Sequence, residues 1–139
     1  MKTPFKITVL TPEGRAYEST AWEVVASTAG GELGIQAKHT PLITVLKPGR
    51  VTIKKEAGEQ HFAVSGGMLE VRKGGEVVVL ADTAERAEDI DFESVEKAHA
   101  RAEEALKRAE NLSKEDFAEF QSELNTHIAR LKLGKIFKK

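Results

Sequence analysis

The 139-residue chain is long enough for one ordinary domain or for a small domain with an appendage. Its 21 basic and 22 acidic residues nearly balance, and 40% of its residues are hydrophobic, which argues against intrinsic disorder and against nucleic acid as a partner. The chain has no cysteine, which excludes disulfide scaffolds, thiol nucleophiles and thiolate metal sites.

The N-terminal segment MKTPFKITVL is the first candidate element, and its apolar run is interrupted by Pro4 and Lys6. It predicts a strand over Phe5–Leu10 rather than a signal peptide. No segment of the sequence reaches the roughly 18 apolar residues of a membrane-spanning helix. We therefore expect a soluble, cytoplasmic protein.

Up to Thr83 short β-branched runs are separated by glycine, proline and charged turns, a pattern typical of an all-β sandwich or barrel. A further strand is expected near Arg15–Glu18. The other expected strands are Ala21–Ala26, Leu42–Leu46, Val51–Lys55, His61–Ser65, Met68–Arg72 and Val77–Leu80, with turns at 12–14, 48–49, 57–59, 66–67 and 74–75.

After Thr83 glycine is absent until Gly134, and the hydrophobic period becomes helical. Asp91 is a suitable N-cap for a helix over 92–110. Its expected apolar stripe is mostly alanine, which lets another helix approach closely but buries little area. The stripe consists of Val95, Ala98, Ala102, Ala105 and Ala109.

A second helix is expected after a joint at Asn111–Leu112, because Ser113 and Asp116 resemble a capping box. The two helices would form an antiparallel hairpin after the β domain. The expected apolar face of the second helix consists of Phe117, Phe120, Leu124, Ile128 and Leu131.

Charge is uneven in this hairpin, since no acidic residue follows Glu123. The cations after it can simply complement the helix dipole or remain solvated, or they can contact an acidic protein surface. These cations are Arg130, Lys132, Lys135, Lys138 and Lys139.

Catalytic and metal-binding patterns are not evident. The four histidines form no HxH or HExxH pattern, and the glycine doublets form no phosphate-binding motif. Glu32 and His39 are the one pair that could serve as orienter and base in a small hydrolase, but no nucleophile or oxyanion device accompanies them.

Three segments in order carry a resemblance: GELGIQAKHTPLITVLKPG (31–49), FAVSGGMLEV (62–71) and VVVLADTAERAEDID (77–91). Together with the terminal elements, they make the chain similar to the epsilon subunit family of bacterial F-type ATP synthases. The resemblance implies a β-sandwich docking domain over 1–84 and a two-helix regulatory hairpin over 85–139.

The resemblance implies a rotor subunit without catalytic residues of its own, peripheral on the cytoplasmic face of the bacterial cell membrane. The sandwich would dock on the gamma subunit and the c-ring, with Glu32 and His39 at that contact. The hairpin could fold on the sandwich or extend toward the alpha and beta subunits and inhibit ATP hydrolysis, and we expect the five C-terminal cations to make the inhibitory contact.

In some bacilli and related bacteria the hairpin also binds ATP as a regulatory ligand. The positions that match such a site are Glu85, Arg86, Ile90, Asp91, Arg101 and Arg130. Ser94 and Thr126 stand where the motif has arginine, and Val95 replaces its alanine. Because each charge-assisted phosphate contact contributes about 1.5–3 kcal/mol, we expect weak ATP binding or none. A free ATP-sensing domain remains an alternative function.

Overall fold

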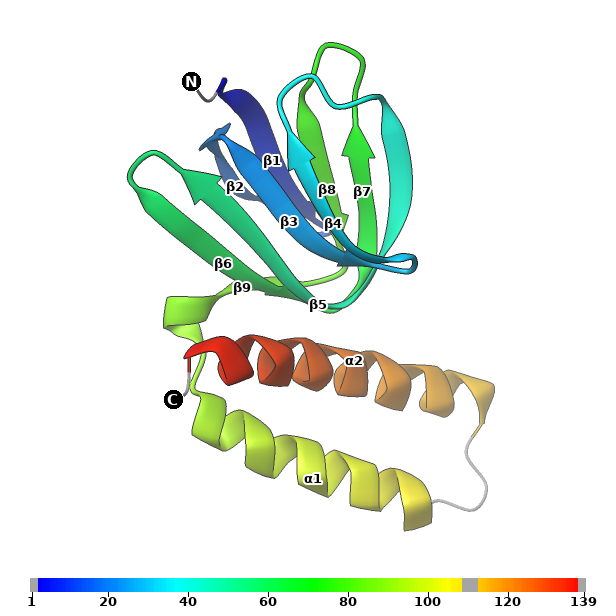
Figure 1. Cartoon of the computed structure of the whole chain (residues 1–139). Helices are drawn as coiled ribbons and strands as arrows, with labels where there is room; N and C mark the ends of the chain where they lie inside the picture. The colour runs from blue at the N-terminus through cyan, green and yellow to red at the C-terminus, as the bar shows by residue number, and fades with distance from the viewer. Residues whose placement is uncertain (1–2, 109–112, 138–139) are drawn as a thin grey trace.

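In the computed structural model, which describes residues 3–108 and 113–137, the chain folds into a β-sandwich followed by a helical hairpin (Figure 1). This confirms the predicted fold class. Helix α2 lies between the sandwich and α1, so the hairpin is folded against the sandwich (Figure 1). The elements within the described residues are β1 (Phe5–Thr11), β2 (Gly14–Ala21), β3 (Glu23–Thr28), β4 (Gly31–Gln36), β5 (Leu42–Lys55), β6 (Gly58–Val64), β7 (Gly67–Val71), β8 (Val77–Ala81), β9 (Ala84–Arg86), the 3-10 helix η1 (Ala87–Asp89), α1 (Phe92–Arg108) and α2 (Lys114–Phe137).

Strand β5 is 14 residues long and joins the two sheets of the sandwich. Its first part, 42–46, pairs with β7, and this first sheet continues through β8 and β1 to β2. Its second part, 49–55, pairs with β6 and β3 in the second sheet, where β4 and β9 are the outer strands. The recorded strand pairs are antiparallel except β1 with β8.

The turn predicted at Pro48–Gly49 is wrong, because the two strands expected on either side form the single bent strand β5. Lys47 and Pro48 fall between the two pairing registers, where the missing N–H of proline costs no ladder hydrogen bond. A β-carbon on Gly49 would lie 3.1 Å from Ser27 Cβ, so the bend packs closely on β3. The turns predicted at 12–14, 57–59 and 74–75 are confirmed, and 66–67 begins with a bend.

Two strands were not predicted. Strand β4 has two glycines among its six residues, and only Ile35 in it is buried, which suits an edge strand but gives little sequence signal. Strand β9 is three residues long and pairs with β6 through Ala84, Glu85 and Arg86.

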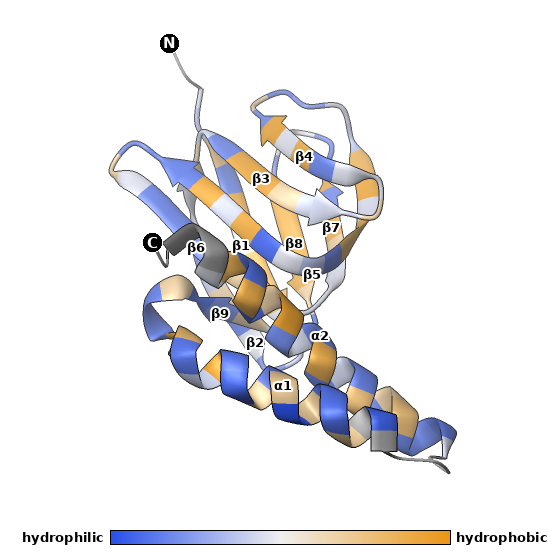
Figure 2. Cartoon of the chain, turned by 60° about the horizontal axis from the view of Figure 1, so that its bottom comes forward, coloured by the Kyte–Doolittle hydropathy of each residue, from blue (hydrophilic) through white to orange (hydrophobic). Residues whose placement is uncertain are grey.

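The main core lies between the two sheets. Ile7, Ile35, Ile53 and Leu69 contribute fully buried side chains to it. Figure 2 shows hydrophobic residues along β1, β7 and β8 and also on α2 where it meets the sheet. All members of this core cluster lie within residues 5–84, before the hairpin begins.

We expect the sandwich to fold without the hairpin, because its core holds no hairpin residue. The boundary expected after Ala84 falls inside β9, so the sheet is complete only at Arg86. A fragment ending at Arg86 should unfold cooperatively by circular dichroism. A fragment ending at Ala84 should melt lower, by about 4–8 °C for each 1 kcal/mol lost. An unfolded fragment 1–86 would contradict this modular division.

Helix α1 begins as predicted. The Ser94 hydroxyl donates to Asp91 Oδ2 at 2.7 Å and the Ser94 backbone N–H donates to Oδ1 at 3.3 Å, and these bonds lower the pKa of the exposed Asp91. Within the stripe, Val95 is buried, Ala98 and Ala102 are half-buried, and Ala105 is exposed, so its inclusion was wrong. Ala109 lies outside the described residues, as does the joint at 111–112.

Helix α2 is also capped as predicted, since the Asp116 N–H donates to Ser113 Oγ at 3.1 Å. Its predicted apolar face is only partly correct: Leu124 is buried, but Phe117 is 50% exposed. The helix contacts α1 on one side and strands β5 and β6 on the other, so it buries residues on two faces. The buried residues of its described side chains are Leu124, His127, Ala129, Leu133 and Gly134.

Candidate functional site

The outer face of the first sheet carries an apolar row that runs across four strands. Leu10, Leu80, Met68 and Val45 are direct neighbours in the registers of β1, β8, β7 and β5. Val45 is 55% exposed, Met68 43% and Leu80 44%, and Ile43 beside them is 63% exposed. We call these five residues the apolar row. An exposed contiguous apolar face of this kind is typical of a protein–protein contact.

The close approach of β7 and β8 determines how the side chains of the apolar row are aligned. Gly67 has φ 138°, and a β-carbon on it would lie 2.0 Å from the Leu80 carbonyl oxygen. Any side chain at this position would therefore push β7 and β8 apart. Glycine at this position brings Met68 opposite Leu80.

The hairpin rests on the second sheet through a small apolar contact, which we call the hairpin seat. Its buried members are Ala63 of β6 and Ala129 and Leu133 of α2. The start of α1 joins this contact, because a β-carbon on Gly134 would lie 2.7 Å from the Phe92 ring. Two of the three buried side chains are alanines, so the seat buries little area compared with the main core.

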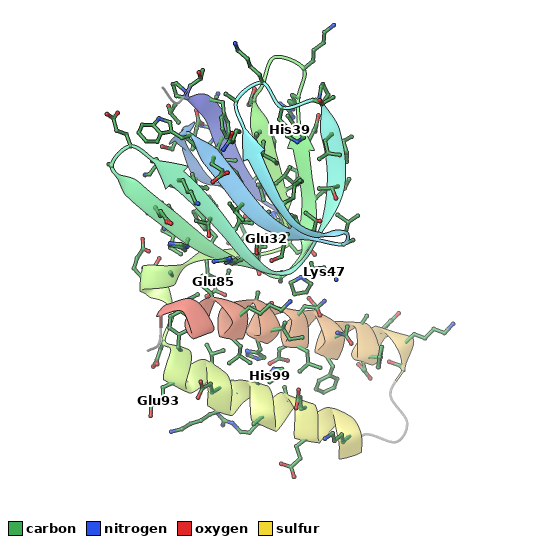
Figure 3. The ribbon with its side chains drawn as sticks, viewed as in Figure 1. Glu32, His39, Lys47, Glu85, Glu93 and His99 are labelled. Atoms are coloured by element: carbon green, nitrogen blue, oxygen red, sulfur yellow. The ribbon has the colours of Figure 1, made fainter. Side chains whose placement is uncertain are left out.

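Two polar contacts reinforce the seat. Arg130 donates to Glu85 Oε1 from Nε and from Nη2, each at 2.6 Å, with side chains that are 27% and 30% exposed. Lys132 Nζ donates to the Pro48 carbonyl oxygen at 2.8 Å, at the bend of β5. Figure 3 shows Glu85 on the side of the sandwich that faces α2.

The residues matched to an ATP site are mostly engaged elsewhere, and only Glu85 and Arg130 are brought together. Arg86 lies over the Tyr17 ring, 5.4 Å from its centroid. Ile90 packs at the hairpin seat, and Asp91 caps α1 through Ser94. Arg101 is exposed and donates from Nε to the Lys97 carbonyl oxygen at 3.4 Å.

A cavity of about 500 Å³ adjoins the Glu85–Arg130 pair. Three parts of the chain line it: the β1–β2 turn, the segment that leads into β9, and helix α2. The α2 residues in the lining are Thr126 and Arg130. Its lining contains three carboxylates, those of Glu13, Asp82 and Glu85, against the two guanidinium groups of Arg15 and Arg130. Such a lining does not favour a triphosphate.

Glu32 and His39 lie at opposite ends of the sandwich, so they cannot act as a catalytic pair (Figure 3). Glu32 is near the start of β4 and forms an ion pair with Arg50 at 3.3 Å. His39 lies beyond the other end of β4, and its Nδ1 donates to the Thr40 carbonyl oxygen at 2.7 Å. Both make these contacts at the exposed surface of the sandwich.

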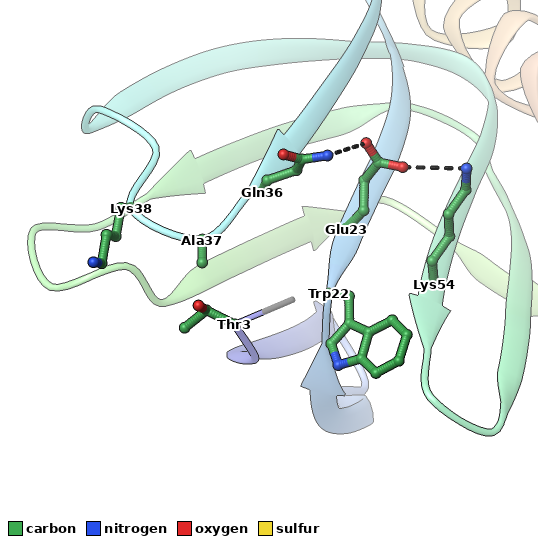
Figure 4. A pocket seen from close by; sticks show the side chains of 7 residues that line it. All are labelled: Thr3, Trp22, Glu23, Gln36, Ala37, Lys38 and Lys54. Carbon is green, nitrogen blue, oxygen red and sulfur yellow. Dashed lines mark hydrogen bonds and ion pairs between the residues drawn. The ribbon is translucent and has the colours of Figure 1, made fainter. Parts of the chain in front are cut away.

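A shallow pocket near the His39 end is lined by Thr3, Ala37 and Lys38 and by the indole of Trp22 (Figure 4). Glu23 bridges its polar groups, accepting from Gln36 at 3.2 Å and pairing with Lys54 at 3.1 Å. The lining therefore has one carboxylate, Glu23, against two ammonium groups, those of Lys38 and Lys54, and Glu23 pairs with Lys54.

Only part of the C-terminal cation group can be located. Arg130 and Lys132 belong to the hairpin seat, whereas Lys138, Lys139 and the side chain of Lys135 lie outside the described part of the chain. Within the described residues no group of three metal-ligating side chains comes together. None of the helices described is long and apolar enough to cross a membrane.

The apolar row was not identified from the sequence, although a signal for it existed. The runs ITVL, LITVL and VVVL are apolar at every or nearly every position, whereas a half-buried strand would alternate. Such runs indicate strands that are covered on both faces. In the fold Val78, which is on the same face as Leu80, is buried, whereas Leu80 itself is 44% exposed, so the outer face is only partly covered.

Comparison with protein families gives two matches that together span most of the chain. Residues 4–87 match the beta-sandwich domain of the ATP synthase delta/epsilon chain, and residues 88–134 match its long alpha-helix domain. The chain is 42% identical to the ATP synthase epsilon chain of Thioalkalivibrio sulfidiphilus, over 96% of this chain and 94% of that one. It is 44% identical to the epsilon chain of Nitrosococcus oceani, over 95% and 93%.

Solved structures show the same fold. A chain in the Euglena gracilis mitochondrial ATP synthase structure of OSCP, F1 and c-ring has a TM-score of 0.74 at 21% identity, covering 96% of this chain and 81% of that chain. A chain of the Tetrahymena thermophila mitochondrial ATP synthase central stalk and c-ring has a TM-score of 0.56 at 18% identity, covering 99% and 98%.

Proposed function

The chain belongs to the ATP synthase delta/epsilon family as an epsilon subunit, and from this premise we propose that it docks on the gamma subunit through the apolar row. The observation that carries the proposal is the alignment of Leu10, Leu80, Met68 and Val45 on one exposed face. A rotor subunit must turn with gamma and needs a stable contact, and an apolar face supplies most of the free energy of such contacts.

Contacts with the c-ring and gamma are proposed at Glu32 and His39, and the assembled subunit would be peripheral on the cytoplasmic face of the cell membrane. Both side chains are on the surface of the sandwich, but at opposite ends. Two such separated positions cannot share one small contact, so at least one of them would face gamma rather than the ring. Crosslinking from single cysteines at 32 and 39, in a chain with no other cysteine, would assign each partner.

The docking proposal is tested with purified gamma and the full chain by size-exclusion chromatography. We expect a stable complex, and the fragment ending at Arg86 should form it as well. Separate elution of the full chain and a folded gamma subunit at micromolar concentrations would contradict the proposal.

We further propose that the hairpin regulates the enzyme by leaving its seat and extending toward the alpha and beta subunits, where it restrains ATP hydrolysis. The small seat supports this proposal, since among the described side chains its buried members are Ala63, Ala129 and Leu133, two of them alanines. The polar contacts of Arg130 and Lys132 are made by side chains that another partner could take over. Extension would therefore exchange these contacts rather than lose them.

ATP binding by the isolated chain should be weak. Arg130 is already held by Glu85, and the adjacent cavity has more carboxylates than guanidinium groups. Calorimetry should give an affinity weaker than micromolar, and Ser94→Arg should improve it about tenfold for each 1.4 kcal/mol gained. Tight binding by the wild-type chain would contradict this expectation and favour the ATP-sensing alternative.

A further inference from the structure

Two histidines face each other in the seam between α1 and α2. The rings of His99 and His127 have centroids 6.3 Å apart with their planes at 73°, and Figure 3 shows His99 between the helices. Their side chains are only 18% and 9% exposed. Within the described residues, the Nδ1 atom of each ring is buried and has no hydrogen-bond partner.

The remaining nitrogen of each ring, Nε2, has a glutamate nearby on its own helix. His99 Nε2 lies 2.8 Å from Glu103 Oε1 and donates a hydrogen bond to that carboxylate. His127 Nε2 lies 3.8 Å from Glu123 Oε1, beyond hydrogen-bond distance. A protonated ring carries an N–H at Nδ1, which would be buried here with no acceptor among the described residues, and two protonated rings would set two cations side by side.

The charges around His127 come from three directions. Glu123 and Arg130 lie on its own helix, and α1 contributes His99. Glu103 of α1 is engaged by His99. From the sandwich, Glu85 of β9 approaches α2, but its recorded partner is Arg130. Glu123 therefore provides the opposing negative charge, and its side chain is 62% exposed and screened by solvent.

We infer that His99 and His127 make the hairpin a proton-sensitive joint, in which acid separates α1 from α2 while the sandwich stays folded. The joint would act on the regulatory hairpin of the proposed function, but it is a property of the isolated chain. Failure of the joint and failure of gamma docking are therefore seen in separate experiments.

The pH range follows from the direction of one pKa shift. Burial, followed by Arg130, lowers the pKa of His127 below 6.5, against the opposite influence of Glu123. A histidine exposed by opening has a pKa of about 6.5. Since the closed form has the lower pKa, the stability from the neutral ring is present above about pH 6.5 and is lost as the pH falls through the closed-state pKa.

Hydrogen exchange of the full chain measures this opening directly, with protection factors corrected for the intrinsic pH dependence of exchange. Between pH 7.5 and 5, in the presence of a metal chelator, the protection of α1 and α2 amides should fall, by at most about tenfold per pH unit for each proton taken up. Amides of β1 and β8 should keep their protection. His127→Gln and His99→Gln should each weaken the pH dependence in the hairpin.

His39→Gln is the matched control, because His39 lies at the far end of the sandwich and should leave the pH dependence unchanged. The inference would be overturned if hairpin protection in the wild-type chain did not depend on pH. It would also be overturned if both seam variants kept the full pH dependence of the wild-type chain. If those variants do not fold, an NMR titration of the wild-type chain decides. A His127 ring that titrates at or above pH 6.5 in the closed hairpin would also overturn it.

Discussion

Met68→Lys should abolish co-purification of the chain with gamma. Met68 is at the centre of the apolar row, directly between Val45 and Leu80, and its side chain is 43% exposed in the isolated chain. In the complex the lysine ammonium would be removed from water without a partner. Central contacts of this kind typically contribute about 2 kcal/mol or more, which corresponds to a roughly thirtyfold weaker complex.

Ala57→Lys is a suitable control, because it adds the same charge at an exposed turn between β5 and β6. Met68→Leu should retain binding, since it preserves an apolar side chain of similar volume. All three variants should have the thermal stability and circular dichroism of the wild-type chain. Undiminished binding by a folded Met68→Lys variant would move the gamma contact to another face of the sandwich.

The fold was largely predictable because its signals are local. Strands such as β1 and β8 have β-branched runs bounded by turn residues, and the caps Asp91 and Ser113 are identified by residue type and spacing. The bend at Pro48 was misread because local chemistry cannot distinguish a turn from a strand that changes its partner. That distinction depends on strands β7 and β6, which pair with β5 from later in the chain.

The candidate site was less predictable because its features depend on register and long-range packing. The apolar row exists only because Leu10 of β1 is aligned with Leu80 of β8 in a parallel pair. The Glu85–Arg130 contact joins residues 45 positions apart. The burial of His127 and Leu133 arises because α2 is covered on two sides, which a single helical stripe does not indicate.

The same two cations have two expected roles. Arg130 and Lys132 hold the folded hairpin in this structure, and they are also predicted to contact an acidic surface of the beta subunits when the hairpin is extended. A two-state hairpin responds to the difference between these contacts. The contact with Glu85 is partly exposed, so it contributes about 1 kcal/mol or less, whereas charge pairs desolvated at an interface can each contribute more.

Substitutions at the two ends of the Arg130–Glu85 ion pair should therefore change ATP hydrolysis by the assembled enzyme in opposite directions. Arg130→Ala with Lys132→Ala should raise hydrolysis, because the extended form loses more than the folded form. Glu85→Gln removes only the ion pair of Arg130 in the folded form and leaves both cations available for the extended form. It should lower hydrolysis by up to about fivefold, the factor that corresponds to 1 kcal/mol.

Hydrolysis and synthesis rates are measured on reconstituted enzyme, with subunit content checked so that assembly is equal in all variants. Glu93→Gln, the same change at an exposed position of α1, should alter neither rate. A decrease in hydrolysis for both the Glu85 variant and the double variant would mean that the cations act only at the hairpin seat. Neither variant could also change hydrolysis while deletion of the hairpin still activates it. The charge contacts would then contribute equally to the folded and extended forms, and the inhibitory contact would belong to the apolar residues of the helices.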